Sequence, residues 1–431
     1  MKKFVLSIIL SVSLIGSAFC ENIFSHRFFE VKLDVPVTVS NNVIGLTDIF
    51  QKTVVIDLPQ IADNLKLSGG ANIRADASPT LSINLDIPNG LIFGISLGAE
   101  ADVSLGLSKD IFEFIGHGNE GLPAEFTQKT TNTYVDVFAN AAITGGWNTK
   151  KQRTVVTGTL FAPVAHLDAG DTSITVYNNA DKNEAGVKAN IDAKVYACAQ
   201  YNDQMSDFMA LIDEGSKGMG FDISADVQRD LFRFLTVGAK ARIPLVPGRL
   251  SYFSSVEQKY EYSINFDDYL NGETEGQGEG EGSSSQGTSN EAEQEQAFEA
   301  PKLGEFTKLD KPYEIHRPLK LGVSADFHPF GTLLTTSGYL GIGVRHPFAK
   351  NTNETDWYID YAVAGKLSLW NILNFEISHS YYDELFKNEF ALALNIRLVE
   401  VDAGISMTSA SFAKSFTGAG IGAFVTVAVG F

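Results

Sequence analysis

Cysteine is scarce in this 431-residue sequence, which contains only Cys20 and Cys198. If Cys20 belongs to an N-terminal export signal, one cysteine remains, and a single cysteine supports neither an internal disulfide nor a zinc site. The seven histidines show no H-E-x-x-H or other metal-ligand spacing. We therefore expect no metal and no other cofactor.

Long hydrophobic runs are also missing. Beyond the N-terminus, no stretch of 18 or more apolar residues occurs, although 44% of the chain is hydrophobic. A protein that crosses the membrane with helices needs such runs. A transmembrane β-barrel does not, because only every second residue of its strands faces lipid.

Basic residues are outnumbered, with 33 Lys and Arg against 52 Asp and Glu and a formal net charge of −19. An acidic chain is poorly suited to binding nucleic acid, and we expect no nucleic-acid partner.

The first 20 residues are typical of a secretory signal peptide. Lys2 and Lys3 precede an apolar segment, residues 4–15, and Ala18-Phe19-Cys20 matches a small-x-small cleavage site. Cleavage near Cys20 would leave Glu21 as the first residue. Alternatively Cys20 carries a lipid, but Phe19 argues against this because lipoprotein signals favour a small residue there. Export without a disulfide framework fits a protein of the bacterial envelope.

Alternation is the main signal that is present. In "LIFGISLGAEADVSLGL", residues 91–107, every odd position is apolar, and most even positions are glycine, serine or acidic. A period of two indicates a β-strand with one apolar face. Seventeen residues exceed most soluble strands and suffice for a tilted strand that crosses a bilayer.

The same pattern recurs along the chain. It appears at 81–87, 135–143, 187–197, 235–245, 319–327, 357–369, 390–398, 399–407 and 421–431. Pro88-Asn89-Gly90 between two of these segments predicts a hairpin turn. We expect an all-β fold, a single antiparallel transmembrane barrel of about 14 strands (about 12–16) over residues 71–431. A soluble sandwich would have to be very large to bury so many long apolar faces.

Two regions break the alternation and matter for function. Residues 21–70 include helical spacing within 40–66, which predicts short helices that either plug the lumen or cap the barrel. Residues 265–305 contain an acidic, low-complexity stretch that cannot bury enough apolar surface to fold. We expect a disordered extracellular loop there, since long barrel loops lie outside the cell.

The C-terminal sequence "IGAFVTVAVGF" alternates and ends on Phe431. It resembles the C-terminal signature of bacterial outer-membrane β-barrel proteins, which implies that Phe431 is an assembly signal and that the barrel-assembly machinery is a partner. The expected strand number and possible N-terminal plug also resemble FadL-type transporters of hydrophobic solutes. Val429 stands where the signature usually has a large aromatic residue, and the Asn-Pro-Ala motif typical of FadL-type proteins is missing near the N-terminus.

Two motifs could suggest an enzyme, and neither fits one. Gly94 to Gly98 matches the G-x-S-x-G pattern, but Ser96 lies in unbroken alternation rather than at a strand-to-helix turn. His379 and Ser380 are adjacent on an expected strand, so their side chains point to opposite faces and cannot pair. We expect no catalytic residues.

Ionisable residues on the polar faces of the expected strands are the functional candidates, because charges that line a pore select solutes through their field. Alternatively these charges pair across the lumen and fill it. The candidates are Arg74, Asp76, Glu100, Asp102, Asp136, Lys188, Asp192, Lys194, Lys240, Arg242, Lys320, Asp326, Asp360, Lys366, Glu376 and Arg397.

These observations support two functional hypotheses. The first is an outer-membrane barrel for passive passage of small solutes, by a porin-like or FadL-like route. The second is a surface-exposed barrel that acts as an adhesin or structural envelope protein through its extracellular loops. In both, the bilayer of the outer membrane is a partner, and the filling of the lumen discriminates between them.

Overall fold

The computed structural model describes most of the strands and their connections. The described residues are 27–41, 70–117, 125–179, 184–200, 208–265, 303–345, 347–348, 356–370, 372–382, 385–396, 398–409, 412–416 and 420–431. The expected signal peptide, the stretch 42–66 of the expected helices, residues 266–302 of the acidic segment and Arg397 lie outside them.

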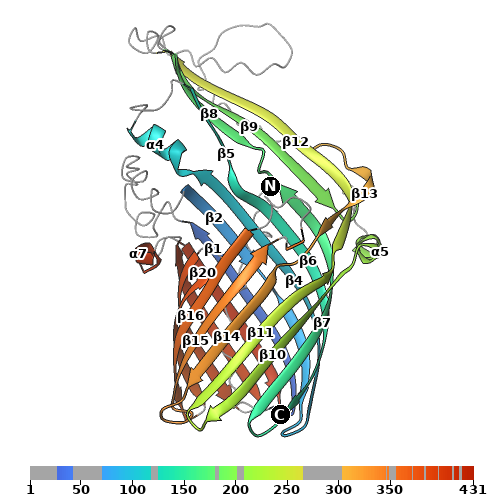
Figure 1. Ribbon diagram of the computed structural model, residues 1–431, viewed down its shortest axis with the longest axis vertical. Helices are drawn as coiled ribbons and strands as arrows, with labels where there is room; N and C mark the ends of the chain where they lie inside the picture. The colour runs from blue at the N-terminus through green and yellow to red at the C-terminus, as the bar shows by residue number, and fades with distance from the viewer. Residues whose placement is uncertain are drawn as a thin grey trace, which may run out of the picture.

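A closed antiparallel barrel of 14 strands forms the main body (Figure 1). One of the 14 positions is shared by β2 and β3, which lie end to end. In order around the wall they are β1 (Phe29–Asn41), β2 (Gly70–Ala77) with β3 (Thr80–Asp86), β4 (Leu91–Ser108), β6 (Thr131–Asn148), β7 (Gln152–Asp168), β10 (Gly220–Phe232), β11 (Leu235–Val246), β14 (Leu319–Phe327), β15 (Leu334–Arg345), β16 (Asp356–Leu369), β17 (Leu373–Tyr382), β18 (Leu385–Ile396), β19 (Val399–Ser409) and β20 (Gly420–Gly430).

The last barrel strand pairs with the first, from Glu30 opposite Gly430 to Pro36 opposite Phe424. This pairing leaves the wall without a free edge, so every strand has two neighbours and its backbone polar groups are satisfied. The prediction of a single antiparallel barrel of about 14 strands is confirmed.

Strand boundaries follow local sequence. The β3–β4 hairpin turns at Pro88-Asn89-Gly90, where Asn89 has a positive φ of 55°. Between β2 and β3, Pro79 lacks an N–H group and the ladder is interrupted. The register is the same on both sides, with Val37 opposite Ala77 and Asp34 opposite Thr80, so the interruption inserts no residue into the wall.

The two ends of the barrel differ in their connections. At one end, hereafter the short-turn end, the connections β3–β4, β6–β7, β10–β11, β14–β15, β16–β17 and β18–β19 are two to six residues long. The beginning of β1 and the C-terminus lie at the same end (Figure 1). The opposite long-loop end carries the longer connections, together with the two-residue β17–β18 connection. Because β1 covers Phe29–Asn41, the barrel begins inside the segment 21–70 that the sequence analysis set apart, and residues 42–69 connect two barrel strands.

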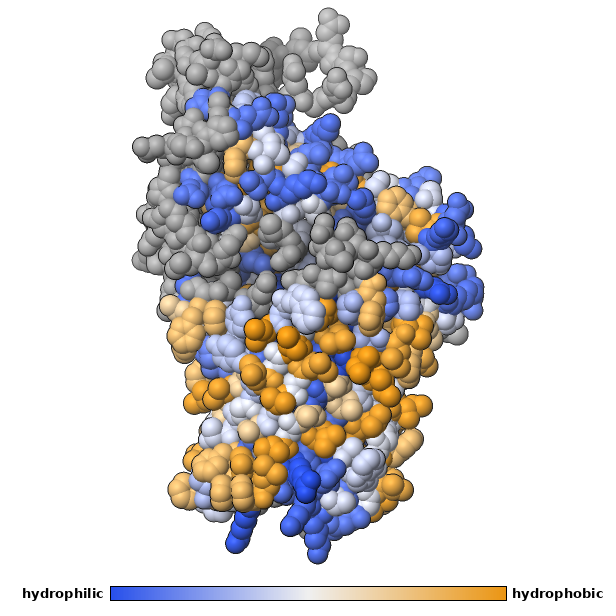
Figure 2. Space-filling view, in the orientation of Figure 1, coloured by the Kyte–Doolittle hydropathy of each residue, from blue (hydrophilic) through white to orange (hydrophobic). Residues whose placement is uncertain are grey.

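The outer face of the wall is apolar. In β4 the outward side chains of Leu91, Phe93, Ile95 and Leu97 are 45–68% exposed. Figure 2 shows this apolar surface as a broad orange band below a hydrophilic upper part. Exposed aromatic rings lie at both borders of the band, as expected for the girdles of a transmembrane barrel. They are Phe28, Trp147, Phe232, Phe234, Phe330, Trp370 and Phe431 at the short-turn end, and Phe348, Trp357, Phe412 and Phe416 at the other.

A second sheet region, hereafter the extension, rises beyond the long-loop end (Figure 1). It contains β5 (Glu125–Lys129), β8 (Ser173–Asn179), β9 (Glu184–Ala197), β12 (Gly248–Asn265) and β13 (Thr307–Ile315). It joins the barrel where β9 pairs with the end of β7, from Ala165 opposite Ala197 to Asp168 opposite Lys194. A buried cluster that includes Phe138, Phe161 and Leu250 packs this junction.

Among the described residues, three short helices lie in the connections at the long-loop end: α4 (Lys109–His117), α5 (Phe208–Lys217) and α7 (Phe412–Ser415). Across the described part of the chain, no helix has both the length and the apolar character needed to span a membrane.

Candidate functional site: the barrel interior

Alternation places one set of side chains inside the barrel. In β14, for example, Leu321, Val323 and Phe327 are exposed outward, so Lys320 and Asp326 face the lumen. By the same parity, the structure places twelve of the predicted residues on the inner wall. They are Arg74, Asp76, Glu100, Asp102, Asp136, Lys240, Arg242, Lys320, Asp326, Asp360, Lys366 and Glu376.

Seven of these twelve residues meet, with three others, in one layer across the lumen. We call this set the ionic layer; it contains Arg74, Asp76, Glu100, Asp102, Asp222, Arg242, Arg317, Lys320, Arg345 and Asp360. Five are cations and five are carboxylates, so the formal charges of the layer sum to zero.

Arg317 is the central cation of the ionic layer. It belongs to the connection between β13 and β14, and its side chain is only 9% exposed. Its guanidinium donates to Asp222 Oδ2 on β10 at 2.7 Å and to Glu100 on β4, and it lies 5.7 Å from the ring of Phe161. Arg317 thus links two barrel strands that are separated by β6 and β7.

A row of carboxylates explains why cations gather on the adjacent wall. Asp76, Asp102 and Asp136 stand directly opposite one another on β2, β4 and β6. Like charges so placed repel unless cations compensate them. Arg74 donates to Tyr134 Oη at 2.8 Å, and Tyr134 donates to Asp102 at 3.2 Å. Buried Arg74 and its tyrosine therefore hold the row together.

Cations from the facing wall complete the layer. Lys320 Nζ donates to Tyr382 Oη, and the charges of Lys320 and Asp76 interact across the lumen. The Arg345 guanidinium lies 4.9 Å from the ring centre of Tyr358 and 5.9 Å from that of Tyr134, which belongs to β6 on the other side. Side chains of opposite walls therefore meet, and the lumen is constricted at this level.

Four of the other five inner-wall residues stand in separate pairs, and the fifth, Asp326, stands opposite Thr236 and Ser337. Lys240 binds Asp226 at 3.0 Å, and Lys366 stands opposite Glu376 on neighbouring strands. Asp136 contacts His166 with Oδ1 and Nδ1 2.5 Å apart, and the imidazole stacks on Tyr313 with ring centres 5.0 Å apart. These three pairs join neighbouring strands along the wall, whereas charges interact across the lumen in the ionic layer.

Three predicted lumen residues stand elsewhere, and for them the placement was wrong. Lys188, Asp192 and Lys194 belong to β9 of the extension, which pairs with β12 and β8 rather than within the barrel wall. Lys188 binds Glu261 at 3.0 Å, with both side chains about half exposed. The extension alternates like a barrel strand, so parity alone could not separate the two.

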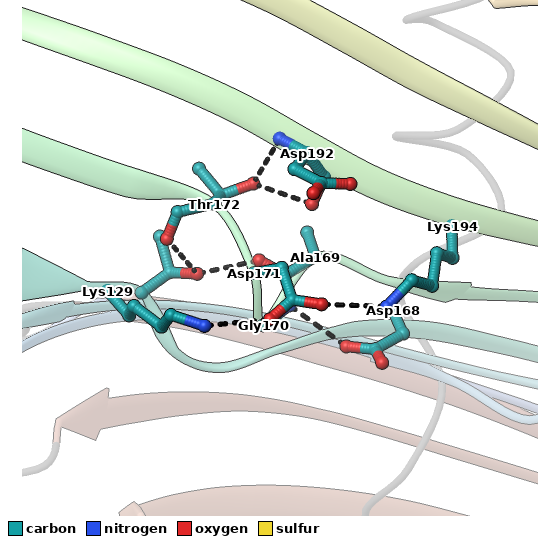
Figure 3. Close-up of polar contacts among 9 residues, drawn as sticks. Lys129, Asp168, Ala169, Gly170, Asp171, Thr172, Asp192 and Lys194 are labelled. Atoms are coloured by element: carbon teal, nitrogen blue, oxygen red, sulfur yellow. Dashed lines mark hydrogen bonds and ion pairs between the residues drawn. The ribbon is translucent and has the colours of Figure 1, made fainter.

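Lys194 helps to fix the base of the extension (Figure 3). Asp171 accepts from Lys129 at 2.8 Å and from Lys194 at 2.7 Å. These two hydrogen bonds lower the pKa of Asp171 to about 2. Thr172 adds a reciprocal pair with the backbone of Asp192, at 3.1 Å each. The contacts tie the β5–β8 ribbon to β9 outside the lumen.

The enzyme-like motifs show no catalytic arrangement. Ser96 lies in the middle of β4, with strand on both sides. His379 faces outward among aromatic rings, whereas Ser380 stands opposite Lys387 on the inner face. Within the described ranges, no three His, Cys, Asp or Glu side chains are grouped so as to hold a metal ion.

Three residues of the ionic layer, Asp222, Arg317 and Arg345, are not among those predicted from the sequence. Asp222 in β10 and Arg345 in β15 both alternate with outward-facing apolar residues. Alternation within these strands therefore indicates that both side chains point inward. Arg317 lies in a connection between strands, where no periodicity indicates the direction of a side chain.

A closed wall, an apolar outer face with aromatic borders and a charged interior occur together only where the outside is lipid. The protein is an outer-membrane-type β-barrel. The barrel matches no protein-family model and no curated protein.

Solved barrels resemble it at low similarity. The Pseudomonas (P. putida) toluene transporter TodX has 12% identity and a TM-score of 0.42, over 94% of this chain and 89% of that one. The CymD monoaromatic hydrocarbon channel has 10% identity and a TM-score of 0.44, over 98% of each chain. The translocator domain of autotransporter NalP from Neisseria meningitidis has 7% identity and a TM-score of 0.34, over 95% and 90%. Similarity at this level bears on neither solute nor mechanism.

Proposed function

We propose that the barrel is a passive channel of the bacterial outer membrane for small polar or charged solutes, with the ionic layer as its selective constriction. In the outer membrane, short turns face the periplasm and long loops face outward. The extension would then project from the cell surface, and Phe431 would lie at the periplasmic end, as expected of an assembly signal.

The observation that supports this proposal is the charge balance of the ionic layer. Asp222 and Asp360 are fully buried, and each interacts with cations of the layer. Paired charges present donors and acceptors to a polar solute without a strong net field for either sign. An apolar solute that crosses this layer cannot replace the hydrogen bonds of the charged side chains that it displaces. The porin-like route is therefore favoured over the FadL-like one.

The test is ion selectivity in planar bilayers. Lys240 lies on the inner wall, and its side chain is 33% exposed. Lys240→Glu should shift the reversal potential in a salt gradient towards cation selectivity, because it replaces a positive charge on the path by a negative one. Lys188→Glu makes the same change of charge on the extension and serves as the matched control.

Two results would contradict the proposal. One is an absence of conductance at every voltage from barrels that are shown to be folded and inserted. The other is an equal shift of the reversal potential in the two variants, because Lys240 would then not line the conducting path.

A second function, interaction at the cell surface, is favoured by the extension. Its strands rise beyond the apolar band, and its surface is hydrophilic (Figures 1 and 2). Lys129, Asp171 and Lys194 hold the β5–β8 ribbon to β9, which would keep a binding surface in a fixed orientation. Barrels that are folded and inserted but do not conduct would favour this function over the channel.

A further inference from the structure

The outer face of the barrel is hollowed at one place near the long-loop end. A groove of about 340 Å³ lies across β16, β17 and β18, and its lining includes Val363, Ile377, Phe390 and Phe416. The first three side chains are 46–59% exposed on the lipid-facing side of the wall. The groove is therefore a depression in the apolar band and not a part of the lumen.

A short helix closes the upper side of the groove. Helix α7 lies outside the wall beside the ends of β18 and β19 (Figure 1). It is fixed by Asn388, whose Nδ2 donates to the buried hydroxyl of Ser415 at 2.8 Å. Phe416, just after the helix, stacks on the His379 ring with centres 5.8 Å apart and planes 6° apart.

His379 and Asn388 provide polar groups in a mainly apolar site. Its Nδ1 and Asn388 Oδ1 are 2.7 Å apart, and its Nε2 and Tyr361 Oη are 3.4 Å apart. These contacts, with Phe386 stacked on the ring at 6.1 Å, fix the imidazole at the upper end of the groove. The rest of the lining is mainly apolar, with Val363, Ile377, Phe390 and Met407, and Thr336 lies beside Gly365 on the neighbouring strand.

We propose that this groove holds one acyl chain of a membrane lipid from the leaflet at the long-loop end. An acyl chain is the expected occupant because the groove is continuous with the apolar band that faces the bilayer. Its mainly apolar wall suits methylene groups, and Phe412 of the upper aromatic border contacts His379 and Phe416, which places the polar end at the level of the headgroups. The site goes beyond the channel function and does not depend on conduction.

Gly365 offers a way to fill the groove without disturbing the wall. A Cβ atom added at Gly365 would meet nothing within 4 Å. The same holds for Gly145 on β6, whose neighbours Ile143 and Trp147 are exposed on the outer face of another part of the barrel. Gly365→Leu and Gly145→Leu are therefore matched variants, and only the first places its side chain in the groove.

The experiment uses the full chain in vesicles of a phospholipid that carries a photoactivatable diazirine in its acyl chain. After irradiation, labelled peptides are mapped by mass spectrometry, and folding is checked from the gel mobility of unheated protein. Peptides with Ile377, Phe390 and Phe416 should be labelled far more than those with Ile95 and Leu97. Gly365→Leu should reduce this labelling by roughly tenfold, and Gly145→Leu should leave it unchanged.

Uniform labelling along the outer wall would overturn the proposal, since it would describe ordinary lipid contact. Labelling at the groove that survives Gly365→Leu in a folded barrel would overturn it as well. Tyr361→Phe and His379→Phe in one double variant provide a second measure. These substitutions remove the polar groups at the upper end of the groove. The labelled positions should then spread along the groove.

Discussion

At the residue scale, the interior of the barrel depends on buried charges that are paired. Arg317 neutralises Asp222 and Glu100, and the Asp222 side chain is 1% exposed. Removing one partner of a buried ion pair leaves an uncompensated charge, which costs more than the pair itself contributes. Arg317→Met should therefore destabilise the barrel by about 3–5 kcal/mol. Unfolding by urea in detergent, followed by tryptophan fluorescence, measures the change.

The control for Arg317→Met is Arg249→Met. Arg249 pairs with Glu314 at 3.6 Å, but its side chain is 56% exposed, and such surface pairs contribute at most about 1 kcal/mol. Adding Asp222→Asn to Arg317→Met should restore part of the lost stability. If both single variants unfold at the same urea concentration, Arg317 is not the central cation of a buried layer.

Asp171 allows a test by pH, because it lies outside the membrane. Its pKa is lowered to about 2 by hydrogen bonds from Lys129 and Lys194. A carboxyl whose folded pKa is depressed stabilises the fold above its unfolded pKa, and this contribution is lost as the pH falls through the folded value. Lys194→Met should move the pKa of Asp171 towards the ordinary value of about 3.9.

A carboxyl-detected NMR titration of Asp171 in detergent micelles measures this pKa. The contact seen in Figure 3 should persist at pH 4 in the wild type, because Asp171 is still ionised there. An ordinary pKa for Asp171 in the wild-type protein would mean that the two lysines do not bind it in solution.

Sequence periodicity predicts the direction of a side chain but not its partner. The inward placement of Glu100, Lys320 and Asp360 follows from alternation alone. That Glu100 meets Arg317 depends on a connection between strands more than 200 residues further along the chain. Such contacts are set by closure of the barrel, which local sequence does not report.

At the element scale, β14 begins and ends at the residues the sequence predicts, Leu319 and Phe327. Strand β9 alternates equally well, yet it belongs to the extension. Alternation shows that the two faces of a strand differ. It does not show whether those faces meet lipid and lumen, as in the barrel wall, or are the two sides of the extension. The difference lies in which strands pair, and the pairing depends on residues distant in sequence.

Close packing of neighbouring strands provides a prediction for one element, the β6–β7 hairpin. A Cβ atom at Gly146 would lie 2.2 Å from the backbone oxygen of Thr154, so any side chain must displace the backbone of β7. Gly146→Ala should destabilise the barrel by about 1–3 kcal/mol. At Gly145 an added Cβ atom meets nothing within 4 Å, so Gly145→Ala should be close to neutral in the same urea unfolding assay. Equal stability of the two variants would contradict the observed register.

At the scale of the whole molecule, an acidic chain folds into a barrel whose constriction has no net charge. The apolar residues that would form a core in a soluble protein lie outside, and the charged residues lie inside. This inversion is stable only if lipid covers the outer face. The proposed channel and the lipid groove both rest on it, although neither depends on the other.

The most direct test of this inversion is the accessibility of spin labels along β3 and β4 in lipid vesicles. Labels are attached to single cysteines at Ile83, Ile95, Leu97, Ser82 and Ser96, with Cys20 and Cys198 replaced by alanine. Labels at the first three positions should collide with oxygen, which partitions into lipid, and the two serine positions with a water-soluble nickel reagent. Water-soluble reagent reaching Ile95 and Leu97 as readily as Ser96 would contradict the account, because the apolar face would then not be in contact with lipid.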